Sequence, residues 1–164
     1  MIEDKRNIVL IGMPTSGKTT VGKILAGHTG RTVIDTDDLV AARVGCPVPQ
    51  YVAEHGEPPF RAIEKECVAE AAAQSGIIVS TGGGVILDPD NVAALKKTGI
   101  LFFLDRPLAL LRPASDRPLS SSADKLTAMF EVRYPFYCAA ADHRIRADRT
   151  PEEEAAQILK AFSE

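Results

Sequence analysis

The sequence predicts an α/β fold, a three-layer sandwich in which helices cover both faces of a parallel β-sheet. Short, almost wholly apolar segments alternate along the chain with longer segments whose apolar residues recur at helical spacing. Strands of a sheet that is covered on both faces carry such unbroken apolar runs. The chain has 164 residues, 45% of them hydrophobic and 25% charged, which fits one domain spanning residues 1–164.

The predicted strands are the short apolar runs. The first contains Ile-Val-Leu-Ile and ends at a glycine, the third ends at three glycines, and the fourth contains Ile-Leu-Phe-Phe-Leu. The last is expected at an edge of the sheet. The ranges are 7–12, 32–34, 77–80, 100–104 and 143–146.

The predicted helices lie between and after these strands. Val21, Ile24 and Leu25 have helical spacing in the first helix, and Pro151 suits the first turn of the last. Pro135 is expected to kink the fifth helix. Residues 106–124 are rich in proline, serine and arginine and are predicted to be a mobile surface segment. The helix ranges are 18–28, 37–44, 59–74, 90–97, 126–141 and 151–162.

Charge and cysteine content exclude several classes of protein. A net charge of −3 provides no basic field for nucleic acid. The three cysteines are few and widely spaced, as in proteins of a reducing compartment. The N-terminal apolar run is too short for a signal peptide or a membrane span. We therefore expect a cytoplasmic protein without nucleic-acid or membrane partners, and a monomer, because no large apolar stripe calls for a partner chain.

The strongest motif is a phosphate-binding loop (P-loop) between the first predicted strand and the first predicted helix. Glycines let the backbone wrap a phosphate chain so that its N–H groups point inward at the start of a helix. Lys18 is predicted to reach the β- and γ-phosphates of a nucleotide, and the Thr19 hydroxyl to coordinate Mg²⁺. The predicted nucleotide-binding segment is Gly12, Met13, Pro14, Thr15, Ser16, Gly17, Lys18, Thr19 and Thr20.

This loop alone does not separate a GTPase switch, an ATPase motor and a small-molecule kinase. The sequence shows no guanine-recognition signature, and we expect no second domain that a motor would drive. These two features favour the kinase.

Candidate acceptor residues follow the second and third predicted strands, whose carboxyl ends should lie beside the phosphate-binding loop. Asp35 and Asp37 could serve Mg²⁺ and an acceptor hydroxyl, or else cap the next helix. Three glycines, Gly82, Gly83 and Gly84, could bring backbone N–H groups against a ligand, or form a plain loop.

Arg61 and Glu64 lie three residues apart on a predicted helix and can therefore pair. A glutamate that holds the guanidinium still would prepare Arg61 to bind a carboxylate. On local grounds, a solvated surface ion pair is the simpler interpretation.

Together these motifs resemble the shikimate kinase family over nearly the whole chain and in the family's order. The P-loop is followed by Asp-Thr-Asp at 35–37, GExxFRxxE at 56–64, TGGG at 81–84, Arg-Pro-Leu at 117–119, and RxxxY formed by Arg133 and Tyr137. The resemblance implies a P-loop kinase fold with sheet order 2-3-1-4-5, a lid at about 110–123 and an acceptor-binding region at about 35–64.

The resemblance also implies ATP, Mg²⁺ and shikimate as ligands. Asp35 would belong to the Mg²⁺ shell, and Asp37 would orient the acceptor hydroxyl. Arg61 and Arg133 would bind the carboxylate, and Gly82–Gly84 would meet the ring hydroxyls. Arg117 would close over the phosphates, and Arg112 would stack on adenine. Another hydroxy acid such as gluconate, a nucleoside monophosphate, or a non-catalytic nucleotide-binding role remain alternatives.

Overall fold

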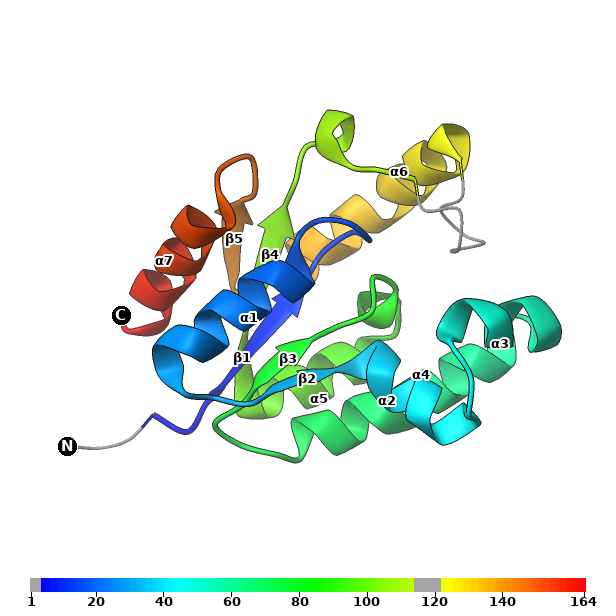
Figure 1. Cartoon of the computed structure of the whole chain (residues 1–164), viewed down its shortest axis with the longest axis horizontal. Coiled ribbons are helices and arrows are strands. Elements are labelled where there is room, and N and C mark those ends of the chain that lie inside the picture. Colours follow the sequence, from blue (N-terminus) through cyan, green and yellow to red (C-terminus); the bar gives the residue numbers. More distant parts are fainter. Residues whose placement is uncertain (1–3, 114–121) are drawn as a thin grey trace.

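The structure, a computed structural model, describes residues 4–113 and 122–164 (Figure 1). These residues form a five-stranded parallel sheet in the order β2-β3-β1-β4-β5, so the expected order is confirmed. In the centre of the sheet, Val9 of β1 lies opposite Val79 of β3 and Leu101 of β4. The strands are β1 Asn7–Ile11, β2 Val33–Asp35, β3 Ile78–Ser80, β4 Gly99–Asp105 and β5 His143–Arg146.

The helices cover both faces of the sheet. Along β1, Ile8 and Leu10 pack with α1 and α7, whereas Val9 and Ile11 face the other way, toward α4, α5 and α6. The two resulting cores explain why the central strands are apolar throughout. The helices are α1 Lys18–Thr29, α2 Thr36–Val44, α3 Val48–His55, α4 Glu57–Ala72, α5 Pro89–Thr98, α6 Ala123–Ala140 and α7 Pro151–Phe162.

Helix α3 was not predicted, and α4 begins two residues earlier than expected. Both differences arise because the sequence prediction treated the prolines in this region as residues that break a helix. Pro49 lies in the first turn of α3, and Pro58 and Pro59 lie in the first turn of α4. Proline is tolerated there because the first N–H groups of a helix have no partner within the helix.

The segment at 106–124 is described only in part. Residues Leu108–Leu110 form a short 3₁₀ turn, η2, and Ser122 caps α6 by accepting a hydrogen bond from the N–H of Lys125. Most of the expected lid, including Arg117, lies outside the described residues. Within the described part of the chain, no helix is long and apolar enough to cross a membrane.

The parallel sheet places three loops together. The carboxyl ends of β1, β2 and β3 lie at one edge, where they lead into the phosphate-binding loop, α2 and the glycine loop. Ligands of such sheets bind at this edge, and the candidate site is built there.

Candidate active site

The phosphate-binding loop between β1 and α1 depends on its glycines. Gly12 has φ 154° and Gly17 has φ 102°, conformations that other residues rarely adopt. A Cβ on Gly12 would meet Ser16 Oγ at 2.9 Å and the Leu104 carbonyl oxygen at 3.0 Å. Both glycines of the motif are therefore needed for the backbone to turn this tightly.

Lys18 closes the loop. Its Nζ donates hydrogen bonds to the carbonyl oxygens of Gly12, at 2.6 Å, and Met13, at 2.9 Å. The side chain is buried, so its ammonium group lies inside the turn of the loop. A lysine held here is adjacent to the loop N–H groups that a phosphate would contact.

A polar cavity of about 310 Å³ opens beside the loop. It brings most of the predicted nucleotide-binding residues together with Asp35 and Asp37. Gly12 and Met13 are buried within the loop and do not line the cavity, and neither does Arg112, whose backbone bonds to Thr15. The cavity is lined by Pro14, Thr15, Ser16, Gly17, Lys18, Thr19, Thr20, Asp35, Asp37, Ser80, Thr81, Gly82 and Gly83.

Asp35 caps α2 and also faces this cavity. Its carboxylate accepts hydrogen bonds from the N–H groups of Asp37, at 2.8 Å, and Asp38, at 3.4 Å. Burial, and then the nearby Asp37 and Asp38, raise the pKa of Asp35 above its ordinary value. The helix-cap interpretation is thus confirmed, and it does not compete with a ligand role, because the same carboxylate lines the cavity.

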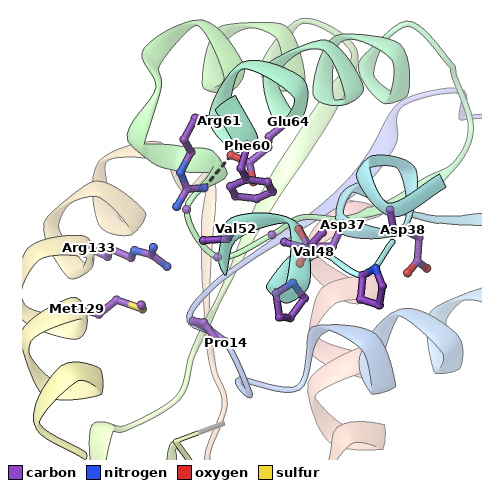
Figure 2. A pocket seen from close by; sticks show the side chains of 16 residues that line it. Pro14, Asp37, Asp38, Val48, Val52, Phe60, Arg61, Glu64, Met129 and Arg133 are labelled. Atoms are coloured by element: carbon purple, nitrogen blue, oxygen red, sulfur yellow. Dashed lines mark hydrogen bonds and ion pairs between the residues drawn. The ribbon is translucent and has the colours of Figure 1, made fainter. Parts of the chain in front are cut away.

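A second cavity, of about 390 Å³, adjoins the first (Figure 2). Arg61 from α4 and Arg133 from α6 both point toward it, although they lie far apart in the sequence. The two cavities share Pro14, Asp37, Gly82 and Gly83 in their walls. Asp37 therefore lies where a molecule in one cavity would meet a molecule in the other.

Two glutamates fix Arg61. Its Nη1 donates to Glu64 at 2.8 Å, and its Nε donates to Glu57 at 3.1 Å. Only 1% of the Glu64 side chain is exposed, so the solvated ion pair expected on local grounds is wrong. Burial raises the pKa of Glu64 despite the opposing charge of Arg61. Burial opposes the charge of Arg61 as well, but Glu64 and Glu57 raise its pKa above the ordinary value.

The glycine loop is packed against these same side chains. A Cβ on Gly82 would lie 2.6 Å from Asp37 Oδ1, and one on Gly83 would lie 3.0 Å from Arg133 Nη1. A Cβ on Gly84 would overlap the guanidinium of Arg61. Each glycine thus lets one predicted site residue approach the backbone, which a plain surface loop would not require.

Part of the site was not predicted from the sequence. Helix α3 contributes an apolar wall through Val48 and Val52, and this wall was missed together with the helix. Met129 also lines the cavity, and its position four residues before Arg133 could have indicated this, because such residues share a helix face. Tyr137 donates a 2.6 Å hydrogen bond to the Gly83 carbonyl, which ties α6 to the glycine loop.

Comparison with known proteins gives one consistent result. The family model for shikimate kinase matches residues 14–163. The chain is 42% identical to a shikimate kinase of Symbiobacterium thermophilum, over 96% of this chain and 97% of that one. It is 40% identical to one of Caldanaerobacter subterraneus subsp. tengcongensis, over 96% of both chains.

Solved structures agree with this result. A shikimate kinase of Acinetobacter baumannii in complex with shikimate superimposes with a TM-score of 0.91 at 30% identity, covering 97% of this chain and 93% of that one. A gluconokinase of Sinorhizobium meliloti gives a TM-score of 0.61 at 15% identity, covering 99% and 96% of the two chains, so that likeness shows the fold alone.

Proposed function

The chain belongs to the shikimate kinase family, and on that premise we propose that it transfers the γ-phosphoryl group of ATP to the 3-hydroxyl of shikimate. The product is shikimate 3-phosphate, an intermediate of the chorismate pathway to aromatic amino acids. The observation that carries the proposal is the shared wall of the two cavities, which contains Asp37. Phosphoryl transfer requires donor and acceptor oxygens to meet at such a junction.

The acceptor cavity has the chemistry that shikimate requires. Arg61 and Arg133 offer paired guanidinium donors for its carboxylate. The backbone of Gly82–Gly84 and the carboxylate of Asp37 lie within the same cavity and offer partners for the ring hydroxyls. Val48, Val52 and neighbouring apolar side chains provide a surface for the carbon ring.

The nucleotide cavity suits the triphosphate of ATP. The N–H groups of residues 15–19 and the N-terminus of α1 supply donors and positive potential. In the complex, Lys18 would exchange its carbonyl partners for phosphate oxygens. By family resemblance we assign Arg112 to the adenine and Arg117, which lies outside the described residues, to the phosphates.

The donor atoms also fit Mg²⁺. The Thr19 hydroxyl and the Asp35 carboxylate line one cavity, and Mg²⁺ is held in proteins by one or two such oxygen ligands together with phosphate oxygens and water. Bound there, Mg²⁺ would neutralise charge on the phosphates.

Individual residues of the chain then have separate roles in phosphoryl transfer. Asp37 accepts a hydrogen bond from the acceptor hydroxyl and orients it for in-line attack. Lys18 stabilises charge on the transferring oxygens.

We assign the exclusion of water from the site to residues at about 110–123. These residues would form the lid of a single domain of residues 1–164, in which the acceptor-binding region spans about 35–64. We also propose that the protein is cytoplasmic, because its three cysteines are unpaired in the structure. We propose a monomer because the sequence shows no large apolar stripe that calls for a partner chain.

Calorimetric binding of shikimate and ADP to Arg133→Ala tests the acceptor assignment. The variant should lose shikimate binding and retain ADP binding, because Arg133 lines only the acceptor cavity. Arg43→Ala is the matched control, since Arg43 pairs with Glu66 and Glu70 outside both cavities. Unchanged shikimate affinity in Arg133→Ala would contradict the assignment.

A further inference from the structure

We propose that Thr15 is a positioning residue whose hydroxyl fixes Arg112 beside the nucleotide cavity. The inference rests on the proposed function only in taking an adenine nucleotide as the ligand of that cavity. It is carried by the backbone conformation of Thr15 and by two hydrogen bonds of its side chain.

Thr15 has an unfavourable backbone conformation. Its φ is 65°, and among the residues that the structure describes it is the only non-glycine residue with a positive φ. A β-branched side chain is especially disfavoured in this left-handed region, whereas glycine adopts it freely. Such strain persists only where the surroundings hold the residue in place, and it commonly marks a functional position.

The side chain of Thr15 shows what holds it. Its hydroxyl donates to the Arg112 carbonyl oxygen at 3.2 Å and accepts from the Arg112 N–H at 3.0 Å. Glycine in this position could make neither bond. The partners are 97 residues apart in the sequence, so the bonds join the phosphate-binding loop to the segment that follows β4.

The rest of that segment is anchored to the body of the protein. Arg106 donates to the carbonyl oxygens of Leu110, at 3.3 Å, and Ala147, at 3.0 Å. The side chain of Leu111 is buried in the core. Arg112 itself is exposed and directly follows these anchors, and both its backbone N–H and its carbonyl oxygen bond to the Thr15 hydroxyl.

This link bears on nucleotide binding because Thr15 lines the nucleotide cavity. Arg112 is thereby held next to the wall of that cavity with its cationic side chain attached to a fixed backbone. A residue that is positioned before the ligand arrives loses less conformational entropy on binding. Loss of the hydroxyl should therefore weaken nucleotide binding even though the loop N–H groups remain.

Calorimetric binding of ADP to four variants tests the proposal. Thr15→Val keeps the shape and loses the hydroxyl, and should weaken ADP binding about three- to tenfold, as expected for the loss of a hydrogen-bonding group. Thr15→Ser keeps the hydroxyl and should stay within about twofold of the wild type. Thr15→Gly should weaken binding as Thr15→Val does, while its melting temperature is at least that of the wild type, because glycine relieves the strain. If Thr15→Val does not fold, Thr15→Gly still tests the loss of the hydroxyl.

The fourth variant is Thr15→Val combined with Arg112→Ala, compared with Arg112→Ala alone. If Thr15 acts through Arg112, the valine should add less than about twofold in this background, since coupled residues are not additive. An undiminished effect of valine there, or wild-type ADP affinity in both Thr15→Val and Thr15→Gly, would overturn the proposal. ADP binding requires no shikimate, so absence of shikimate turnover would overturn the proposed function and leave this test intact.

Discussion

Glu64 Oε1 accepts a 2.8 Å hydrogen bond from Arg61 Nη1, and although both side chains line the acceptor cavity, Glu64 is 1% exposed whereas Arg61 is 24% exposed. The pair is therefore asymmetric. Glu64 is fixed by the packing around α4, and Arg61 is held by Glu64 in the position where it can meet a carboxylate. A spacing of three residues on a helix predicted the contact, but its role depends on which partner is buried.

Glu64→Gln tests this asymmetry. The variant keeps the size of the side chain and removes its charge, so Arg61 should be held less firmly and the KM for shikimate should rise about tenfold, with the KM for ATP unchanged. Glu57→Gln is the control, because Glu57 also bonds Arg61 but is exposed. It should change neither KM by more than about twofold. Steady-state kinetics with each substrate varied in turn measures both KM values. Equal effects of the two variants on the KM for shikimate would contradict the account.

Gly84→Ala tests the close approach of the glycine loop to Arg61. Gly84 has φ −96°, which any residue can adopt, so the added methyl acts only through its overlap with the guanidinium. Overpacking costs about 1–3 kcal/mol, and the KM for shikimate should accordingly rise about tenfold or more.

The control for Gly84→Ala is Gly27→Ala in α1, where a Cβ would meet nothing within 4 Å. This change should leave both KM values unaltered and raise the free energy of unfolding by about 1 kcal/mol. An unchanged KM for shikimate in Gly84→Ala would show that the guanidinium of Arg61 does not need to lie against Gly84 in order to bind shikimate.

Tyr137→Phe tests the link between α6 and the glycine loop. It removes the 2.6 Å hydrogen bond to the Gly83 carbonyl and keeps the ring that stacks on Phe103. The KM for shikimate should rise about three- to tenfold and the free energy of unfolding should fall by about 1–2 kcal/mol. Tyr134→Phe is the control, since the Tyr134 hydroxyl bonds Asp105 instead. A variant at Tyr137 that loses stability but keeps its shikimate KM would reduce this tyrosine to a structural role.

Glu154 should make stability depend on pH. This buried side chain at the start of α7 is surrounded by Arg106, Asp148 and Glu153, and burial raises its pKa from the ordinary 4.5 to about 7. The folded state therefore binds the proton more tightly than the unfolded state. The resulting stability is fully present below the unfolded pKa and is lost as pH rises through about 7, by on the order of 2–3 kcal/mol.

Urea unfolding at pH 5 and pH 8 checks this prediction. Glu154→Gln, which cannot ionise, should be more stable than the wild type by about 2 kcal/mol at pH 8 and similar to it at pH 5. Glu153→Gln changes an exposed neighbour and should shift stability by less than about 0.5 kcal/mol at either pH. An equal gain for Glu154→Gln at both pH values would contradict a titrating carboxyl.

The sequence predicted the parts of the fold and site that depend on local pattern. The apolar runs located the strands, and the glycines and lysine of the phosphate-binding loop fell between β1 and α1 as expected. Helix α3 was missed because Pro47 and Pro49 lie at its start and because its helical character depends on packing against α2 and α4. Local pattern also cannot show that Glu64 is buried, since the residues that cover it come from other elements of the chain.

The sequence also could not predict the hydrogen bonds that join distant segments of the chain in the site. The bonds of Thr15 to Arg112 and of Tyr137 to Gly83 join residues 97 and 54 positions apart. Sequence reasoning placed Asp35, Asp37 and Gly82–Gly84 beside the phosphate-binding loop, because carboxyl ends of parallel strands meet at one edge of the sheet. It could not show that Asp37 lies in both cavity walls.

The most direct test of that central claim is ADP release from Mg²⁺-ATP, measured with and without shikimate, for the wild type and for Asp37→Asn. If the junction of the two cavities is where transfer occurs, shikimate should stimulate ADP release strongly in the wild type, and Asp37→Asn should reduce the stimulated rate by at least about 100-fold. ATP binding without any stimulation by shikimate, or a wild-type rate in Asp37→Asn, would contradict the account.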